Sequence, residues 1–233
     1  MVKVFSFCLY GPPNPRYYPL SILQNISLIA THYPGWKVYL YTAPDVDQSF
    51  LDQVASHQNV VLRPTGKLGS VNMIERFFAI DEPDVDTMFV RDADSHVHWK
   101  DRWAIDDFLQ RPKYSFHIIR DNIKHAARIM GGMWGMRKSA NLSIRGMYSL
   151  YLQNPLDCGI GEDQNFLTGY VYPDVRAKAL VHFSNRQLRD GETGIPFPFV
   201  WSNDVYCGRC DDATVFVDTA YVRPPIYPFL KFS

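Results

Sequence analysis

Residues 86–99 read Asp-Thr-Met-Phe-Val-Arg-Asp-Ala-Asp-Ser-His-Val-His-Trp, and this stretch organises the rest of the chain. Thr87 to Val90 is an apolar, β-prone run with the length of a buried strand. The run ends abruptly in the acidic sequence Arg91-Asp92-Ala93-Asp94-Ser95. Open α/β sheets bind ligands beyond the carboxyl ends of their strands, so Asp92 and Asp94 are predicted to lie at a ligand site.

The Asp92/Asp94 pair suits a hard divalent cation. Carboxylate oxygens at this spacing are good ligands for Mn²⁺ or Mg²⁺, and such an ion can also bridge the phosphates of a substrate. His182, on a late predicted strand, is the candidate third ligand, and its nitrogen favours Mn²⁺ over Mg²⁺. A packed or hydrogen-bonded core histidine is the alternative for His182.

Two other Asp-x-Asp pairs occur, and both are predicted to be turn or cap residues because they fall between elements. They are Asp45/Asp47 and Asp84/Asp86. The position after a strand, and not the pattern itself, therefore distinguishes Asp92 and Asp94.

Apolar periodicity predicts a β-α-β-α-β-α-β order up to Val90. The predicted strands cover residues 2–9, 37–41, 60–62 and 87–90, and the predicted helices cover 20–33, a short segment capped by Asp47, and 69–80. Further helices are predicted over 101–109, 141–153 and 159–170, with strands over 114–119, 131–136 and 179–183. The proline-rich chain from Gly191 onward is predicted to be irregular. This order predicts an α/β fold with a mainly parallel sheet and helices on both faces.

Length and composition limit the class of protein. A chain of 233 residues is long enough for one α/β domain. Equal numbers of basic and acidic residues, 24 each, give zero net charge and argue against a nucleic-acid partner. There is no apolar run of roughly 20 residues to span a membrane, no signal-peptide pattern, and only four scattered cysteines. We therefore expect a cytoplasmic protein without a transmembrane segment.

Several charged residues at predicted element ends are candidates for chemistry. Arg76, Arg91 and Arg120 are candidate phosphate partners, because a guanidinium matches phosphate in a bidentate way. Asp121 and Asp163 are candidate bases or acceptors for a sugar hydroxyl. Surface ion pairing for the arginines, and helix capping for Asp163, are the structural alternatives.

Loops add further candidates. Tyr10 to Tyr18 is a stiff proline-rich loop that suits either the wall of a nucleobase pocket or a rigid turn. Gly132, in a glycine-rich strand, permits close approach of a ligand or another backbone. Cys207-Gly-Arg-Cys210 resembles half of a zinc knuckle, but no second Cys/His pair stands at ligand spacing, which disfavours a structural zinc site.

His96 and His98 continue the alternation of Asp92 and Asp94 and support a rival function. Four such side chains on one side of an extended segment would make a metal-dependent phosphohydrolase. Ordinary loop histidines are the alternative. The chain has no Walker loop, no Gly-x-Gly-x-x-Gly and no Gly-x-Ser-x-Gly motif.

Five short motifs follow one another along the chain. They are Arg91-Asp92-Ala93-Asp94-Ser95, His117-Ile-Ile-Arg120-Asp121, Gly131-Gly-Met-Trp-Gly135, Gly161-Glu-Asp-Gln164 and Val181-His182-Phe183. As a set they resemble small GT-A-fold glycosyltransferases, in particular those of large algal (chlorella-type) viruses and their bacterial relatives. The resemblance extends from the first strand to about residue 200.

The resemblance implies a single GT-A-like domain that transfers a sugar from a nucleotide-diphosphate donor, most often UDP-linked, to a glycan or glycoprotein acceptor. It implies a nucleotide-sugar half over residues 1–95, an acceptor and catalytic half over 96–200, and a tail over 201–233. The implied cofactor is Mn²⁺ (or Mg²⁺) on Asp92, Asp94 and His182, and the implied catalytic residues are Asp163 and Asp121. Implied donor contacts are Ser6, Leu9, Tyr10, Gly11, Arg76, Arg91, Asp92, Ala93, Asp94, Arg120 and Gly132. A non-catalytic sugar-binding domain is a further alternative.

Overall fold

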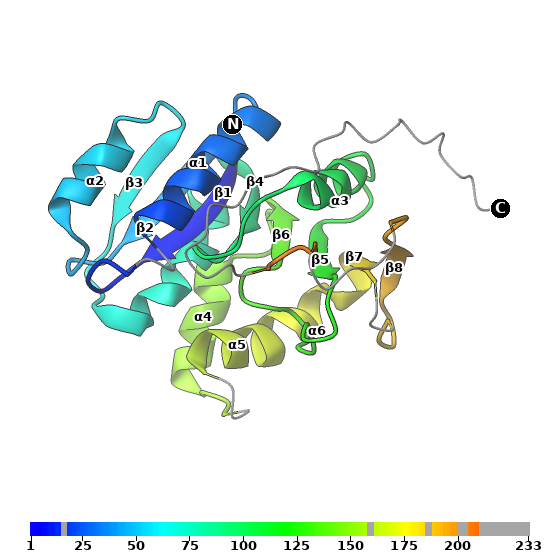
Figure 1. The fold of residues 1–233 in the computed structure, drawn as a ribbon. Coiled ribbons are helices and arrows are strands. Elements are labelled where there is room, and N and C mark those ends of the chain that lie inside the picture. The colour runs from blue at the N-terminus through cyan, green and yellow to red at the C-terminus, as the bar shows by residue number, and fades with distance from the viewer. Residues whose placement is uncertain (15–17, 158–160, 185–187, 200–204, 210–233) are drawn as a thin grey trace.

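A mainly parallel sheet of eight strands forms the centre of the chain in a computed structural model, which describes residues 1–14, 18–157, 161–184, 188–199 and 205–209 (Figure 1). The strand order is β3-β2-β1-β4-β6-β5-β7-β8. The strands are β1 (Val2–Leu9), β2 (Lys37–Thr42), β3 (Val60–Pro64), β4 (Val85–Val90), β5 (Phe116–Arg120), β6 (Trp134–Arg137), β7 (Ala179–Phe183) and β8 (Thr193–Pro196). Of these described strands, β6 alone runs antiparallel to its neighbours.

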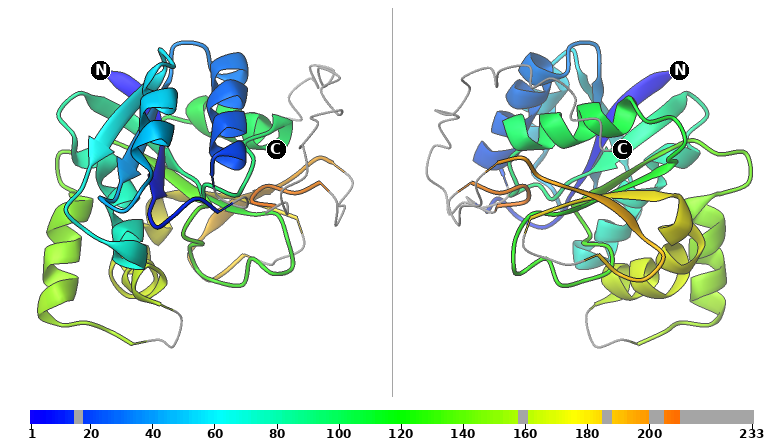
Figure 2. Two further views of the ribbon diagram at one scale, coloured as in Figure 1. Left: turned by 60° about the vertical axis from the view of Figure 1, so that its left-hand side comes forward. Right: turned by 90° about the vertical axis from the view of Figure 1, so that its right-hand side faces the viewer.

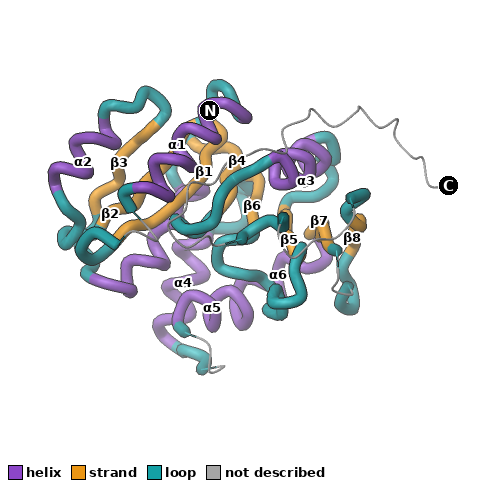
Figure 3. The backbone as a smooth tube through the Cα atoms, viewed as in Figure 1, coloured by secondary structure: helices purple, strands orange, loops and turns teal. Residues whose placement is uncertain are grey.

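Helices cover both faces of the sheet, as Figures 2 and 3 show. The first face, here called the α1 face, carries α1 (Leu20–His32), α2 (Gln48–Ala55) and α3 (Trp99–Leu109). The opposite face, called the η1 face, carries the 3₁₀ helix η1 (Gly69–Asp81), α4 (Ile144–Gln153), α5 (Glu162–Phe166), the π-helical turn η2 (Leu167–Val171) and α6 (Tyr172–Val175). A short 3₁₀ turn, η3 (Arg176–Lys178), leads into β7. The predicted α/β fold with helices on both faces is confirmed.

Successive side chains along a strand point to opposite faces of the sheet, so each strand contributes core residues to both faces. In β1, Phe5, Phe7 and Leu9 pack under the helices of the α1 face, whereas Val4 and Cys8 pack toward η1. In β4, Phe89 belongs to the α1 face, and Met88 and Val90 belong to the η1 face. The same alternation decides on which side each polar residue after a strand emerges.

The order in which the strands are added creates a crevice at the sheet edge. From β1 the chain moves outward to β2 and β3, and then returns to place β4 on the other side of β1. The carboxyl ends of β1 and β4 therefore lie side by side where the winding direction reverses. In open α/β sheets, ligands bind at such switch points. The loops after Leu9 and Val90 both leave the sheet at this switch point.

Some local predictions need correction. Residues 69–81, predicted as a helix over 69–80, form a 3₁₀ helix. Residues 193–196, predicted to be irregular, form the edge strand β8 beside β7. Asp47 caps α2 as predicted, because its side chain accepts a hydrogen bond from the Phe50 amide.

A buried ion pair connects the start of β8 to the end of β5. Arg120, at the end of β5, donates two hydrogen bonds of 2.8 and 2.7 Å to the carboxylate of Glu192. Glu192 also accepts a bond of 2.8 Å from the Tyr172 hydroxyl. Burial acts to raise the pKa of Glu192, but these partners outweigh it and the pKa lies below its ordinary value of 4.5. The charged carboxylate therefore stabilises the fold.

We predict that Glu192→Gln lowers the free energy of unfolding at pH 7 by roughly 3–5 kcal/mol, because it leaves Arg120 buried without a counter-ion. The lowered pKa means that this stabilisation is present above the ordinary value of 4.5 and is lost as pH falls through the folded-state value. As pH falls through that value, the free energy of unfolding should therefore decrease less for the variant than for the wild type. Urea unfolding across pH measures both effects.

Glu82→Gln is the matched control, because Glu82 forms an exposed pair with Arg145 at 3.4 Å. Exposed pairs contribute about 0–1 kcal/mol, so this variant should unfold much like the wild type. Equal losses in the two variants would refute a special role for the buried pair.

Candidate functional site

A buried arginine between two carboxylates marks the crevice beyond β1 and β4. The Arg76 side chain, on η1, is 5% exposed, and its Nη1 lies 2.6 Å from Asp92 Oδ1. Its Nη2 lies 3.5 Å from Asp163 Oδ2. Burial acts to lower the pKa of Arg76, but Asp92, Cys8 and Asp163 outweigh it, so the guanidinium stays charged. We call Arg76, Asp92 and Asp163 the carboxylate clamp.

Two glycines make room for the carboxylate clamp. A Cβ atom at Gly132 would lie 2.3 Å from Asp92 Oδ2, and one at Gly131 would lie 3.0 Å from Arg76 Nη2 and 3.2 Å from Asp163 Oδ2. A methyl group at Gly132 is therefore incompatible with the observed position of Asp92. Gly132, predicted to allow a close approach, lies in the site and permits contact with the first aspartate of the acidic pair.

The carboxylate clamp leaves Asp92 accessible. Its side chain is 38% exposed and Asp163 is 17% exposed, whereas Arg76 lies beneath them. Arg76 was predicted to contact phosphate directly, but its position supports the two carboxylates instead. Asp163 shares Arg76 with Asp92, and the Gln164 amide donates a hydrogen bond of 2.8 Å to its Oδ1.

Asn25 fixes the loop that carries Asp92 and Asp94. This asparagine of α1 is fully buried, and its Nδ2 donates to the carbonyls of Ala93 at 3.3 Å and Ser95 at 3.1 Å. Its Oδ1 accepts a bond of 3.0 Å from the Val97 amide. Sequence reasoning missed Asn25, because a polar residue in an amphipathic helix gives no sign of a partner 70 residues away.

The end of β1 is held in a similar way. Asn72 donates from Nδ2 to the carbonyls of Leu9 at 2.9 Å and Tyr41 at 3.2 Å. Ser6 donates from Oγ to the Arg76 carbonyl at 2.6 Å and is fully buried. Ser6 and Leu9, predicted donor contacts, thus support the site from below. Tyr10 and Gly11, which follow the end of β1, are partly exposed.

Strand alternation places Arg91 on the opposite face from Asp92. The Arg91 side chain is 1% exposed and forms an ion pair with Asp101 of α3, with 2.9 Å between Nε and Oδ1. Its Nη1 also donates to the Val90 carbonyl. The structure thus contradicts the prediction that Arg91 contacts phosphate. Ala93 is likewise buried under the α1 face, with 7% of its surface exposed.

Arg120 and Asp121 also lie outside the site. Arg120 is paired with Glu192 as described, and Asp121 is fully buried with 2.7 Å between its Oδ2 and Lys100 Nζ. Asp121 also accepts hydrogen bonds from the Ser184 hydroxyl and the Cys207 amide. Both oxygens are occupied, so the geometry gives no support to Asp121 as a catalytic base or to Arg120 as a phosphate ligand.

His182 lies on the α1 face and does not join Asp92 and Asp94. Its Nε2 donates to Asp107 Oδ2 at 3.1 Å, and its Nδ1 accepts from His117 Nε2 at 2.8 Å. Burial lowers the pKa of both histidines, so this pair is neutral. In addition, β7 is three strands from β4, a separation of about 14 Å. The predicted third metal ligand therefore serves the core, as in the alternative interpretation.

The histidines of the rival hydrolase also have structural partners. His96 Nε2 lies 2.8 Å from Gln24 Oε1 on α1. His98 caps α3, where its Nδ1 accepts from the Lys100 amide at 3.2 Å. Among the described residues, the structure does not gather these two rings with Asp92 and Asp94 into a metal-binding group.

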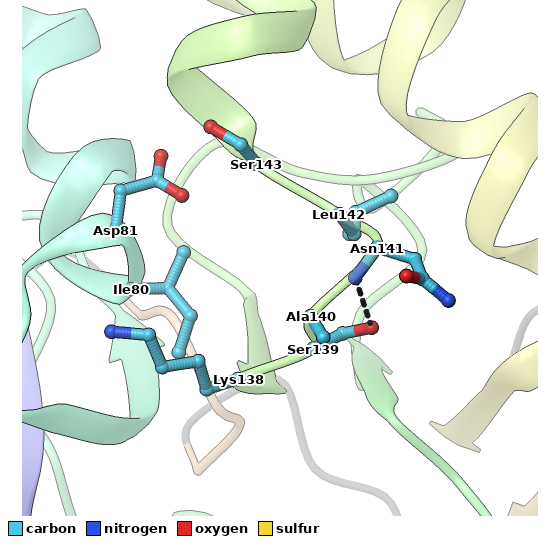
Figure 4. Close-up of a pocket in the computed structure, with 8 residues that line it drawn as sticks. All are labelled: Ile80, Asp81, Lys138, Ser139, Ala140, Asn141, Leu142 and Ser143. Carbon is cyan, nitrogen blue, oxygen red and sulfur yellow. Dashed lines mark hydrogen bonds between the residues drawn. The ribbon is translucent and has the colours of Figure 1, made fainter.

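A separate cavity of about 450 Å³ lies away from these residues (Figure 4). It is lined by residues 138–143 together with Ile80 and Asp81. Because β6 runs antiparallel to β4, Lys138 follows the strand end opposite to Asp92, where its amide donates to the Asp86 carbonyl. The cavity therefore opens at the other edge of the sheet and belongs to a different region from the carboxylate clamp.

Comparisons with known proteins define the fold. No protein-family model matches the chain, and no curated protein does. Among solved structures, the chain is similar to 4-diphosphocytidyl-2C-methyl-D-erythritol synthase from Anaerococcus prevotii, with a TM-score of 0.53, 12% identity, and coverage of 78% of this chain and 86% of that chain. The chain therefore shares the α/β fold of that enzyme, with one mainly parallel sheet and helices on both faces.

Two glycosyltransferases are also similar to the chain. One is involved in glycosylation of the major capsid of PBCV-1, with a TM-score of 0.49, 14% identity, and coverage of 78% of this chain and 82% of that chain. The other is GlyE of Streptococcus pneumoniae, with a TM-score of 0.48, 14% identity, and coverage of 75% of this chain and 44% of that chain. Both likenesses concern the fold, at low sequence identity.

We predict that Asn25→Ala lowers the free energy of unfolding by roughly 1–3 kcal/mol, because it leaves the buried Ala93 and Ser95 carbonyls without their donor. Hydrogen exchange at the Val97 amide should accelerate more than exchange in β1. Asn59→Ala is the control, since Asn59 makes one partly buried bond, to the Ile26 carbonyl at 3.1 Å. Unchanged exchange at Val97 would show that Asn25 does not fix the acidic loop.

Proposed function

We propose that this protein transfers a sugar from a nucleotide-diphosphate donor, UDP-linked in the first instance, to a hydroxyl acceptor on a glycan or glycoprotein. The observation that carries the proposal is the carboxylate clamp at the switch point between β1 and β4. A charged donor of this kind needs a ligand site at the carboxyl ends of the strands, and the crevice there contains accessible carboxylates.

A divalent ion fits this donor set. Asp92 is accessible, the lack of a side chain at Gly132 lets its carboxylate lie close to the backbone, and Asp94, which is buried, follows two residues later. We assign Asp92 and Asp94, without His182, as the residues that would hold Mn²⁺ or Mg²⁺. When bound, such an ion acts as a Lewis acid that stabilises the charge on the departing diphosphate.

The protein's own groups have separate tasks in this proposal. Arg76 positions Asp92 and Asp163 and offsets part of their charge. Tyr10 and Gly11 follow the end of β1, and we assign them to contact the nucleotide. Asp163 is the candidate base, or the candidate charge that stabilises the oxocarbenium-like sugar. It is partly exposed, and Arg76 contacts both Asp163 and Asp92.

The decisive assay incubates the protein with Mn²⁺, a panel of nucleotide sugars and a panel of acceptor sugars. Transfer to an added sugar supports the proposal. Hydrolysis of the donor alone would instead indicate a phosphohydrolase, and tight binding without turnover would indicate a sugar-binding domain. The positions of His96 and His98 already weaken the hydrolase alternative.

We predict that binding of UDP or a UDP-sugar weakens at least about tenfold when EDTA removes the divalent ion, a loss of ~1.4 kcal/mol. The reason is that the three arginines predicted to contact phosphate, Arg76, Arg91 and Arg120, are buried. Titration calorimetry with and without EDTA measures the difference. Equal affinity under both conditions would refute the metal assignment.

Two glycine variants locate this effect on Asp92. Gly132→Ala should reduce donor affinity, because the added methyl group displaces the Asp92 carboxylate. Gly146→Ala is the control, since a Cβ atom there would meet Ser143 at an ordinary 3.5 Å. The conclusion requires that both variants melt like the wild type.

We predict that Asp163→Asn lowers turnover by roughly 10²–10⁴-fold, the range for a lost acid–base group, while donor binding persists. Glu162→Gln is the matched control, because the neighbouring Glu162 carboxylate accepts a bond from the Tyr148 hydroxyl and faces α4. Single-turnover kinetics and donor titration separate the two steps. If donor affinity collapses while the rate per bound donor stays normal, Asp163 serves binding or folding.

A further inference from the structure

We propose that His98, Asp101 and Cys207 form a second metal site, of the zinc class, at the N-terminal end of α3. One ligand atom from each residue lies within 4.8 Å of the others, and all three residues are buried. His98 is 3% exposed, and Asp101 and Cys207 are fully covered. This site is independent of the proposed sugar transfer and of Asp92 and Asp94.

An unpartnered oxygen points to a cation at this position. Asp101 Oδ1 is bound by Arg91 at 2.9 Å. Its Oδ2 has no hydrogen-bond partner within the described part of the chain, although it is buried, and it lies 4.0 Å from His98 Nε2. A buried carboxylate oxygen without a partner is costly, and a bound cation would satisfy it.

The fold assembles these ligands from distant parts of the chain. His98 and Asp101 stand three residues apart at the start of α3, so both side chains lie on the same side of the helix. Cys207 comes from a segment that two hydrogen bonds hold in place. Lys100 Nζ, on α3, donates to the Val205 carbonyl at 3.3 Å, and the Cys207 amide donates to Oδ2 of Asp121, which follows β5, at 2.9 Å.

The structure thus supplies the partners that the Cys207-Gly-Arg-Cys210 run lacks in the sequence. A His/Asp pair one helical turn apart meets Cys207, a pairing that no local spacing could reveal. Cys210 lies outside the described residues, and the proposed site does not depend on it.

The ligand set selects the metal. One thiolate, one imidazole and one carboxylate would supply three of the four ligands of tetrahedral Zn²⁺, with a water molecule as the fourth, whereas Mn²⁺ and Mg²⁺ prefer sites made of oxygen ligands. Binding releases the Cys207 thiol proton to solvent, because the thiolate is the metal ligand. Within His98 the ring proton moves from Nε2 to Nδ1, so the bonds to the Tyr206 carbonyl and the Lys100 amide are given up.

The ion would fasten residues 205–209 to α3 more firmly than the hydrogen bonds alone. Arg91 and Lys100, the nearby cations, are already paired with Asp101 and Asp121. The thiolate formed on binding offsets part of the charge that the ion brings. A zinc ion here acts as a structural tie, remote from the carboxylate clamp on the other face of the sheet.

The test measures zinc in the purified full-length protein and then replaces it with Co²⁺. We expect about one zinc per chain and, with Co²⁺, a near-ultraviolet thiolate-to-metal charge-transfer band, because the site contains a cysteine ligand. Chelation should abolish the band and lower the melting temperature. Asp92→Asn should leave the band unchanged, which separates this site from the proposed donor site.

Conservative variants keep the test informative. Cys207→Ser should abolish the band, whereas Cys8→Ser, at a second buried thiol, should retain it. His98→Asn should lower Co²⁺ affinity at least about tenfold, while its side-chain oxygen still caps α3. His96→Asn, the same change at a buried histidine outside the cluster, should not alter affinity.

The inference is overturned if the wild-type protein takes up no zinc and shows no thiolate band with Co²⁺. It is also overturned if the band persists in Cys207→Ser, if it disappears in Asp92→Asn, or if His98→Asn binds Co²⁺ as tightly as the wild type. Each comparison uses variants whose far-ultraviolet circular dichroism matches that of the wild type.

Discussion

The guanidinium of Arg76 is the constraint on which the candidate site depends. It is buried beneath the sheet edge, and it stays charged because Asp92 and Asp163 contact it from two different parts of the fold. Leaving such a charge buried without a partner typically costs roughly 3–5 kcal/mol. The stability of η1, the acidic loop and α5 is thus coupled to keeping two carboxylates next to each other at the crevice. Two carboxylates would repel each other there without the intervening positive charge.

Strand alternation then sorts the remaining polar residues. Because side chains alternate between faces, Arg91 points to α3 and Asp92 points to η1, although they are adjacent in the chain. His182 emerges on the α1 face for the same reason and bonds to Asp107 of α3. One face of the sheet edge therefore contains the candidate site, and the other contains the structural ion pairs and the histidine pair.

Much of the fold could be predicted because its signals are local. The apolar runs of β1 and β4, the periodicity of α1 and the Asp47 cap each depend on a few neighbouring residues. The position of Asp92 at a strand end followed from the same information. The partners of Arg91, Arg120 and Asp121 did not, because a buried ion pair and a phosphate site use the same residue types. Extending the alternation of β4 by one residue would have assigned Arg91 and Asp92 to different faces.

The carboxylate clamp also bears on how the proposed donor would bind. Asp92 already has a counter-ion in Arg76, so an added divalent ion gains less there than it would from an unpaired carboxylate. Asp92 and Asp94 offer only part of an oxygen coordination shell, which for Mn²⁺ or Mg²⁺ has about six ligands. The phosphates of the donor would complete that shell. Ion and donor should therefore bind interdependently, and the fold itself should not require the ion, because Arg76 is a counter-ion of Asp92 in either case.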